Sequence, residues 1–281
     1  MAAVAFFGLT AACSSDDEGA NGSGGGGGSG GGGAPTPPIP AAPATCPTLA
    51  TGNITVMDQQ VQLWVGPAGT AGPIIFYWHG TGSNSGEALL LGSAVQEIQS
   101  NGGVIASFTT TTRTGDNTGN NVWFTGDFQM ADQILACGVQ QGVVDPRRIY
   151  AAGCSAGGLQ AGAMTYDRSS YLAASMPNSG GTVFPYTLED PSHTPAVITA
   201  HGGPQDMVIV SFSEMSARLD NGIKALGGFV VDCNHGGGHC GSPGELREAQ
   251  WQFAKDHPFG VTPEPYASGL PASFPAYCQI L

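Results

Sequence analysis

The fold is decided by the stretch Arg148-Ile149-Tyr150-Ala151-Ala152-Gly153-Cys154-Ser155-Ala156-Gly157-Gly158. Its apolar first half predicts a buried strand, and the Gly-x-Ser-x-Gly-Gly pattern at its end predicts a sharp turn into a helix over residues 159–166. Glycines on both sides leave room for so tight a bend, which lifts the Ser155 hydroxyl above the edge of the sheet. Ser155 is therefore the candidate nucleophile, and the Ala156 N–H at the start of the helix is a candidate donor to an oxyanion.

The Gly-x-Ser-x-Gly pattern alone is weak in a chain with 45 glycines, because short motifs recur by chance. A second match, centred on Ser29, lies in a glycine tract with no strand before it and no helix after it. Ser155 has both, and this context favours a nucleophile over the alternative of a structural turn serine.

Strands and helices alternate along the domain that surrounds Ser155. Alternating apolar residues at 53–65 predict antiparallel strands at a sheet edge, while fully apolar runs predict buried strands. We expect an α/β fold with a mostly parallel central sheet, helices on both faces, a single domain and no separate lid. The predicted buried strands cover 73–78, 104–108, 148–153, 171–176, 196–201 and 229–231, and the remaining predicted helices cover 84–100, 128–141, 211–226 and 245–257.

The first 44 residues differ in composition from the rest of the chain. Residues 1–12 are apolar and small and end at Cys13, which predicts an export signal and a lipid-attachment cysteine rather than a frayed terminus. Eleven of the fifteen residues from 19 to 33 are glycine and five prolines follow, so residues 13–44 are predicted to form a disordered tether. The catalytic domain is then expected over residues 45–281, in a protein that is exported, either as a cell-surface lipoprotein or in secreted form.

Charge excludes several kinds of partner. The chain carries 8 basic and 21 acidic residues, for a net charge of −13, which disfavours nucleic acid and anionic membrane surfaces. Contact with a membrane is expected only through a lipid anchor at Cys13. Only 10% of the residues are charged, which fits an exported monomer that acts on an uncharged or apolar substrate.

Six cysteines remain besides Cys13, and an even number in an exported chain predicts disulfides. An alternative is a zinc site made by Cys233, His235, His239 and Cys240, although structural zinc sites usually show other spacings. The favoured pairing has one local disulfide, one that joins the ends of the domain, and one left by elimination: Cys233–Cys240, Cys46–Cys278 and Cys137–Cys154.

A serine hydroxyl needs a base to take its proton and an acid to orient that base. The loop after the strand at 196–201 offers Asp206 as the acid, with Asp232 in reserve. The loop after the next strand offers two histidines, of which His239 is favoured because three glycines before it let the loop bend back over Ser155. His235 remains the alternative base.

Other residues at strand ends have predicted supporting roles. The Thr81 N–H, in a glycine-rich loop after the strand at 73–78, is the expected second oxyanion donor. His79 and His201 each precede a glycine and are expected to support the site rather than react. Trp123 and Phe124 are predicted to face the substrate, with an aromatic plug over the core as the alternative.

Taken together, four motifs resemble those of the α/β-hydrolases, in the branch of polyhydroxybutyrate depolymerases and feruloyl-esterase-like enzymes. The resemblance implies a serine carboxylesterase that hydrolyses uncharged polyester, phenolic or short-acyl esters through an acyl-enzyme and needs no cofactor. It implies Ser155, Asp206 and His239 as the triad; Cys154 beside the nucleophile departs from the pattern. Alternatives are a serine peptidase or acyltransferase with the same triad, or a non-catalytic binding lipoprotein. The motifs are His79-Gly80-Thr81-Gly82, Gly153-Cys154-Ser155-Ala156-Gly157-Gly158, His201-Gly202-x-x-x-Asp206-x-Val208 and Gly236-Gly237-Gly238-His239.

Overall fold

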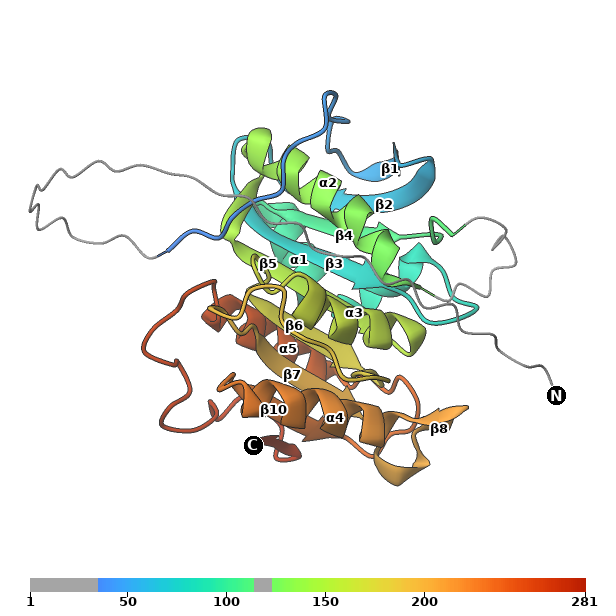
Figure 1. Ribbon diagram of the computed structural model, residues 1–281, viewed down its shortest axis with the longest axis vertical. Coiled ribbons are helices and arrows are strands. Elements are labelled where there is room, and N and C mark those ends of the chain that lie inside the picture. The colour runs from blue at the N-terminus through green and yellow to red at the C-terminus, as the bar shows by residue number, and fades with distance from the viewer. Residues whose placement is uncertain (1–34, 114–122) are drawn as a thin grey trace, which may run out of the picture. The chain divides into compact units, whose positions relative to one another are not determined.

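Nine strands form the main sheet in the computed structural model, which describes residues 35–113 and 123–281 (Figure 1). The predicted export signal, Cys13, Ser29 and residues 114–122 lie outside the described residues. The strands are β1 (Gly52–Val56), β2 (Gln59–Val65), β3 (Gly72–Trp78), β4 (Val104–Phe108), β5 (Val144–Cys154), β6 (Ala174–Asn178), β7 (Ala196–His201), β10 (Val230–Asn234) and β11 (Cys278–Ile280).

The spatial order of the strands is β1-β2-β4-β3-β5-β6-β7-β10-β11. The six from β4 to β10 in this order run parallel, whereas β1, β2 and β11 pair antiparallel at the two edges. The predicted α/β class and the antiparallel edge at residues 53–65 are therefore confirmed. Because the central strands are parallel, the loops that follow β5, β7 and β10 emerge at the same edge of the sheet.

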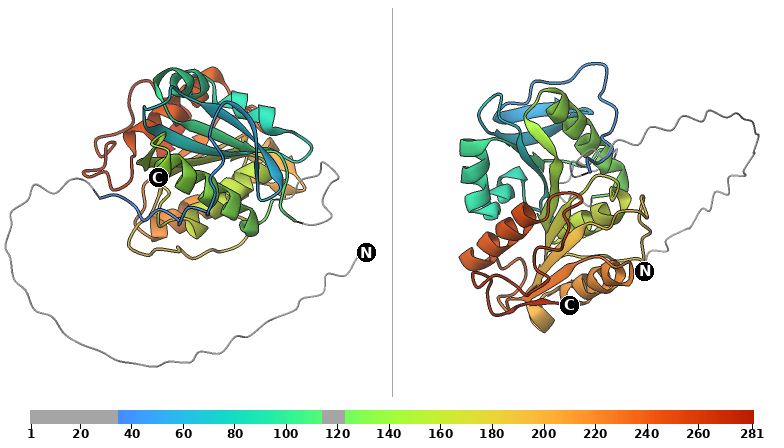
Figure 2. Two further views of the ribbon diagram at one scale, coloured as in Figure 1. Left: turned by 90° about the horizontal axis from the view of Figure 1, so that it is seen from above. Right: turned by 90° about the vertical axis from the view of Figure 1, so that its left-hand side faces the viewer.

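Helices cover both faces of the sheet, as Figure 2 shows from two sides. Alternate residues of β3 serve the two layers: Ile75 and Tyr77 pack in one hydrophobic cluster, and Ile74, Phe76 and Trp78 pack in the other. This double burial explains why the whole strand is apolar. No helix of the described part is long and apolar enough to cross a bilayer. The helices are α1 (Ser93–Asn101) and α5 (Gly244–Asp256) on one face, and α2 (Phe128–Gln140), α3 (Ala156–Asp167) and α4 (Phe212–Ala225) on the other.

Three local elements differ from the prediction. The helix expected over 84–100 is interrupted at Gly92, whose φ of 62° breaks the hydrogen-bond ladder between the 3₁₀ helix η1 (Ser85–Leu91) and α1. Two further elements are new: β11, which replaces β10 as the last strand, and a hairpin made by β8 (Met207–Val208) and β9 (Val210–Ser211). Both are too short to give a periodic signal.

Residues 35–44, which the sequence assigns to the tether, lie against the domain. Pro37 is buried, and Ile39 packs against the cluster beneath α2 and α3. Pro35 reaches the loop at Gly260, where an added Cβ would lie 2.4 Å from the Pro35 ring. This proline-rich stretch is therefore a strap on the surface of the domain, held by the apolar contacts that its rings make.

The structure has three disulfides, but the predicted pairing is wrong at every bond. The prediction paired cysteines by their positions along the chain, whereas the order of the strands in the sheet decides which sulfur atoms lie close together. Cys233 lies directly opposite Cys278 where β10 pairs with β11, and the other bonds join loops to helix or strand ends. The zinc alternative loses its two thiolates, since both are bonded to other cysteines. The pairs are Cys46–Cys137, Cys154–Cys240 and Cys233–Cys278.

Candidate active site

Ser155 occupies the turn between β5 and α3 in a conformation that few residues adopt. Its φ of 57° and ψ of −123° are strained for a residue with a side chain, and such strain is found mostly at functional sites. The turn is tight because Gly157 lies against β3: an added Cβ there would lie 1.7 Å from the Trp78 carbonyl oxygen. Ser155 is only partly buried, so its hydroxyl is available at the edge of the sheet.

The loop after β3 lies beside the serine. A Cβ added at Gly80 would lie 3.3 Å from the Cβ of Ser155. Glu87 fixes this loop, because its carboxylate accepts hydrogen bonds from the Gly80 N–H at 3.1 Å and from the Tyr77 hydroxyl at 3.1 Å. Thr81, the residue after Gly80, is exposed. The predicted oxyanion loop is thus adjacent to the predicted nucleophile.

Asp206 lies in the loop after β7 and is completely buried. Its Oδ1 is 2.7 Å from His239 Nδ1, while its Oδ2 accepts hydrogen bonds from the Ser179 hydroxyl at 2.6 Å and the Gly202 N–H at 2.9 Å. Burial acts to raise the pKa of Asp206, but these hydrogen bonds from Gly202, Ser179 and His239 outweigh it and lower the pKa below its usual value. Asp206 is therefore an ionised carboxylate at neutral pH.

His239 lies in the loop after β10, and its ring is held on two sides. Asp206 binds Nδ1, and the Phe212 ring lies against the imidazole with centroids 4.6 Å apart. The following residue, Cys240, donates its N–H to the Ser179 hydroxyl at 2.8 Å. Ser179 therefore bridges the acid and the histidine loop through one oxygen.

The disulfide Cys154–Cys240 joins the turn of the nucleophile to the loop of the histidine. Cys154 precedes Ser155 and Cys240 follows His239, and their Cα atoms are 5.8 Å apart. The serine and the imidazole are thus on chain segments that are covalently fixed side by side, although 84 residues separate them in the sequence (239 − 155). The predicted acid and base are in hydrogen-bond contact, and the disulfide holds the loop of His239 next to the turn of Ser155.

The reserve candidates have other partners. His235 accepts the Gly237 N–H at Nδ1 within its own loop, and burial lowers the pKa of its imidazole. Asp232 binds His201 Nε2 at 3.1 Å rather than His239. His201 in turn accepts the Gly203 N–H at Nδ1, so its proton is on Nε2, and it contacts the start of the loop that carries Asp206.

The sequence did not predict that buried Asp220 and partly buried Asp232 lie close together, near the loop that carries Asp206. The Thr199 hydroxyl lies 3.1 Å from Asp220 and 3.4 Å from Asp232. Burial, and then the nearby carboxylate of Asp232, raise the pKa of Asp220 to about 8. A protonated Asp220 can donate a hydrogen bond to the Thr199 hydroxyl, and that hydroxyl can then donate its own hydrogen bond to Asp232. In the sequence, Asp220 is one acidic residue among others in a predicted helix, and no sequence signal shows that the fold buries it.

The two aromatic residues predicted to face substrate separate in the structure. Trp123 is buried, stacks edge-on against Trp78, and donates its indole N–H to the His79 carbonyl at 2.8 Å. Trp123 therefore packs over the core, which was the alternative to facing the substrate. Phe124 is half-buried, and the guanidinium of Arg113 lies 4.7 Å from its ring centroid. Phe124 alone keeps an exposed aromatic surface.

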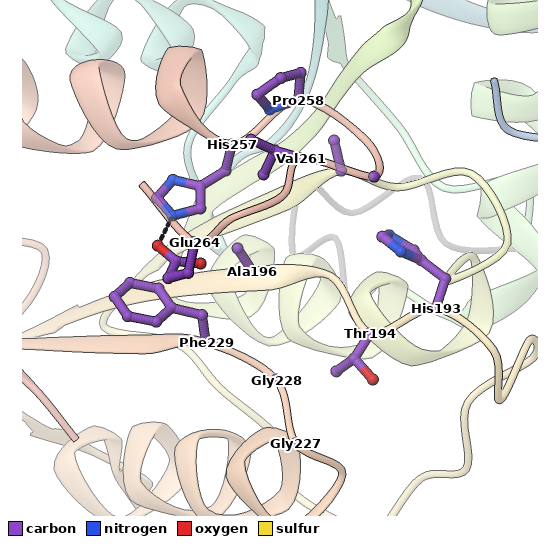
Figure 3. A pocket seen from close by; sticks show the side chains of 12 residues that line it. His193, Thr194, Ala196, Gly227, Gly228, Phe229, His257, Pro258, Val261 and Glu264 are labelled. Atoms are coloured by element: carbon purple, nitrogen blue, oxygen red, sulfur yellow. Dashed lines mark hydrogen bonds and ion pairs between the residues drawn. The ribbon is translucent and has the colours of Figure 1, made fainter. Parts of the chain in front are cut away.

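A cavity of about 400 Å³ opens at the opposite edge of the sheet (Figure 3). Its lining includes Phe229, just before β10, and Ala196 at the start of β7, which are the strand ends remote from Ser155. The buried His257 is bonded to Glu264 at 2.9 Å through Nε2 and to a backbone carbonyl through Nδ1. This cavity is separate from the constellation around Ser155.

Comparison with known proteins identifies the fold. No family model and no curated protein matches the chain. Among solved structures, native pOPH is similar over 85% of this chain and 96% of its own, with a TM-score of 0.62 and 17% identity. Native sOPH gives 0.59 and 14% over 86% and 96%. A carboxylesterase of Bacillus cereus gives 0.53 and 17% over 69% and 94%. The chain has the α/β-hydrolase fold.

Proposed function

We propose that this protein is a serine carboxylesterase that hydrolyses uncharged esters through an acyl-enzyme. One observation carries the proposal: an ionised, buried Asp206 bonded to His239, on loops joined by a disulfide to the strained turn of Ser155. The similarity to a carboxylesterase from Bacillus cereus supports the same class of reaction. The fold alone hosts many activities, so the site is the stronger support.

The proposed mechanism gives each proton of the first step a place. Because Asp206 is ionised and accepts at Oδ1, His239 carries a proton on Nδ1, and the proposed mechanism uses its other ring nitrogen, Nε2, as the base. Nε2 takes the proton of the Ser155 hydroxyl while the Ser155 oxygen bonds to the carbonyl carbon of the ester. The resulting imidazolium gives that proton to the alcohol oxygen as the carbon–oxygen bond breaks, leaving an acyl-serine. Water then repeats the sequence and releases the acid.

Two backbone donors would stabilise the tetrahedral oxyanion. The Ala156 N–H is in the first turn of α3, where no preceding helical carbonyl accepts it and the helix dipole favours negative charge. The Thr81 N–H is in the loop that Glu87 holds beside Ser155. Removing one such donor typically costs about 100- to 1,000-fold in kcat.

The charge around the site supports an uncharged substrate. Between Gly202 and Ser213 the only charged side chain is Asp206, which is buried. The loop at 79–84 and the loop at 235–241 contribute no lysine, arginine, aspartate or glutamate. A substrate carboxylate would therefore find no cation from these loops, and the net charge of −13 would repel it.

The test is turnover of soluble p-nitrophenyl butyrate by the wild type and Ser155→Ala, together with labelling by a fluorophosphonate. We expect wild-type turnover and labelling of Ser155, both lost in Ser155→Ala. Turnover that survives in Ser155→Ala would contradict the assigned nucleophile. Absence of both turnover and labelling in the wild type would favour a non-catalytic binding protein, and faster cleavage of amides than of esters would favour a peptidase.

We also propose that the protein is exported. Three disulfides support this, because they persist in oxidising compartments and are rare in the cytosol. The segment ending at Cys13 supports a lipid anchor on the cell surface. Mass spectrometry of the mature chain tests the anchor: an unmodified Cys13 thiol would contradict it.

A further inference from the structure

The hairpin of β8 and β9 leaves the domain at the candidate active site. Its two ends are Asp206 and Phe212, which are joined by a hydrogen bond of 2.9 Å from the Phe212 N–H to the Asp206 carbonyl. Both residues also contact His239. Figure 1 shows the hairpin beyond the first turn of α4, on the side toward which the parallel strands point. It therefore stands at the rim of the site.

The hairpin exposes a continuous set of apolar side chains. Met207 is 64% exposed, Val208 is 48% exposed and Ile209, at the tip, is fully exposed. Single exposed apolar residues are normal on protein surfaces, but three in succession at the end of a projecting element are a recognisable mark of an interaction site.

The tip is also strained. Ile209 has a φ of 66°, in the left-handed region where a β-branched residue is a marked exception. Asparagine or glycine would fit this position better and would expose less apolar surface. The chain thus carries two unfavourable features at one residue, conformational strain and exposure of an isoleucine, with no compensating contact in the folded domain. Such a residue is expected where an outside surface covers it.

From these observations we propose that the β8–β9 hairpin adsorbs the enzyme to the surface of a water-insoluble, uncharged ester. The inference rests on the proposed esterase function and adds the physical state of its substrate. The occupant follows from charge and position: the hairpin sequence Met-Val-Ile-Val-Ser has no charged residue, the acidic chain disfavours anionic surfaces, and Asp206 lies at the base of the hairpin. Adsorption through Ile209 would place the ester surface beside Ser155.

The test uses polycaprolactone particles as a neutral, insoluble ester and measures how much protein they remove from solution. The protein is the full chain carrying Ser155→Ala, so that hydrolysis does not alter the surface. Adding Ile209→Asn should weaken adsorption by about tenfold or more, because the variant lacks the isoleucine side chain that adsorption would bury. The matched control is Leu226→Asn, an equally simple change at a residue that is 48% exposed at the far end of α4. It should adsorb like the parent.

A fold readout keeps the result interpretable. Ile209→Asn should melt no lower than the parent, since asparagine tolerates a positive φ. In the active chain, the ratio of turnover on particles to turnover of soluble p-nitrophenyl butyrate should fall by a similar factor.

Four results would overturn the inference while leaving the esterase function intact. The first is turnover of the soluble ester by a wild type that does not adsorb. The second is equal adsorption of Ile209→Asn and its parent, and the third is tighter adsorption to neutral phosphatidylcholine vesicles than to the polyester. A wild-type dimer that Ile209→Asn dissociates in sedimentation would also overturn it, because the hairpin would then bind a second copy. Failure on the soluble ester itself would instead reject the proposed function.

Discussion

At the scale of single residues, Ser179 is the group that joins the acid to the histidine loop. Its hydroxyl donates to Asp206 Oδ2 and accepts the Cys240 N–H, and the residue is completely buried at a φ of 40°. One oxygen thus satisfies both the buried carboxylate of Asp206 and the backbone N–H of Cys240. Ser179 touches no reacting atom, so its role is to position Asp206 and the loop of His239.

Ser179→Ala should lower kcat by roughly 10- to 100-fold with little change in KM, because a small displacement of the imidazole misaligns proton transfer. The free energy of unfolding should fall by about 1–3 kcal/mol, the cost of leaving buried polar groups without a partner. Steady-state kinetics on a soluble ester and urea unfolding measure the two effects.

The matched control for this substitution is Ser216→Ala. The Ser216 hydroxyl is also buried and donates to the Gly180 carbonyl at 3.2 Å, but it does not contact Asp206. We expect Ser216→Ala to lose stability while keeping kcat. If both variants lose kcat equally, Ser179 is a general structural residue and positions nothing in particular.

At the scale of elements, two disulfides of nearly equal span serve different parts of the fold. Cys154–Cys240 links residues 86 apart and joins the β5–α3 turn to the histidine loop. Cys46–Cys137 links residues 91 apart and joins the segment that follows the strap to α2. Since the loss of chain entropy depends on the length of the closed loop, removing either bond should destabilise the domain by a similar amount, on the order of 2–5 kcal/mol.

Catalysis should distinguish the two bonds. The double variant Cys154→Ala/Cys240→Ala should lose at least about tenfold in kcat on a soluble ester, because Ser155 and His239 are no longer tied together. The double variant Cys46→Ala/Cys137→Ala should keep kcat at a temperature where both remain folded, as checked by circular dichroism. Equal kcat in the two variants would show that loop packing alone holds the site.

At the scale of the whole molecule, stability should depend on pH through two buried carboxyls with opposite shifts. The pKa of Asp206 is lowered, so its contribution to stability is present above its unfolded pKa and is lost as the pH falls. The pKa of Asp220 is raised to about 8, so the folded state holds a proton that the unfolded state releases near pH 4. Asp220 therefore makes stability fall as the pH rises from about 4 to 8.

Asp220→Asn should remove this decline. The asparagine amide can still donate to Thr199, yet it cannot lose a proton, so the free energy of unfolding of the variant should stay level where that of the wild type falls by up to about 1.4 kcal/mol per pH unit. Urea unfolding at intervals from pH 5 to pH 9 measures the difference. If the free energy of unfolding changed with pH in the same way in the wild type and the variant, the proton would not be on Asp220.

Much of this molecule could be predicted from sequence because its central strands are long, apolar and parallel. The strands that precede Ser155, Asp206 and His239 each end in a polar loop, so the sequence alone could assign these three residues to one edge of the sheet. The disulfides could not, since Cys278 meets Cys233 only through β11, a strand of three residues. The Ser179-Gly180-Gly181 motif is part of the family resemblance, but the sequence predicted neither a role for Ser179 nor the hairpin, because both depend on contacts made after the chain has folded.

The bond between Cys154 and Cys240 also has a consequence for when the protein becomes active. A newly synthesised chain in a reducing cytosol holds two free thiols at these positions, and nothing covalent then keeps the turn of Ser155 beside the loop of His239. Under the proposed export, oxidation after translocation would complete the proposed catalytic arrangement. The proposed esterase would then be a weak catalyst toward the cell's own esters and would reach its full activity only outside.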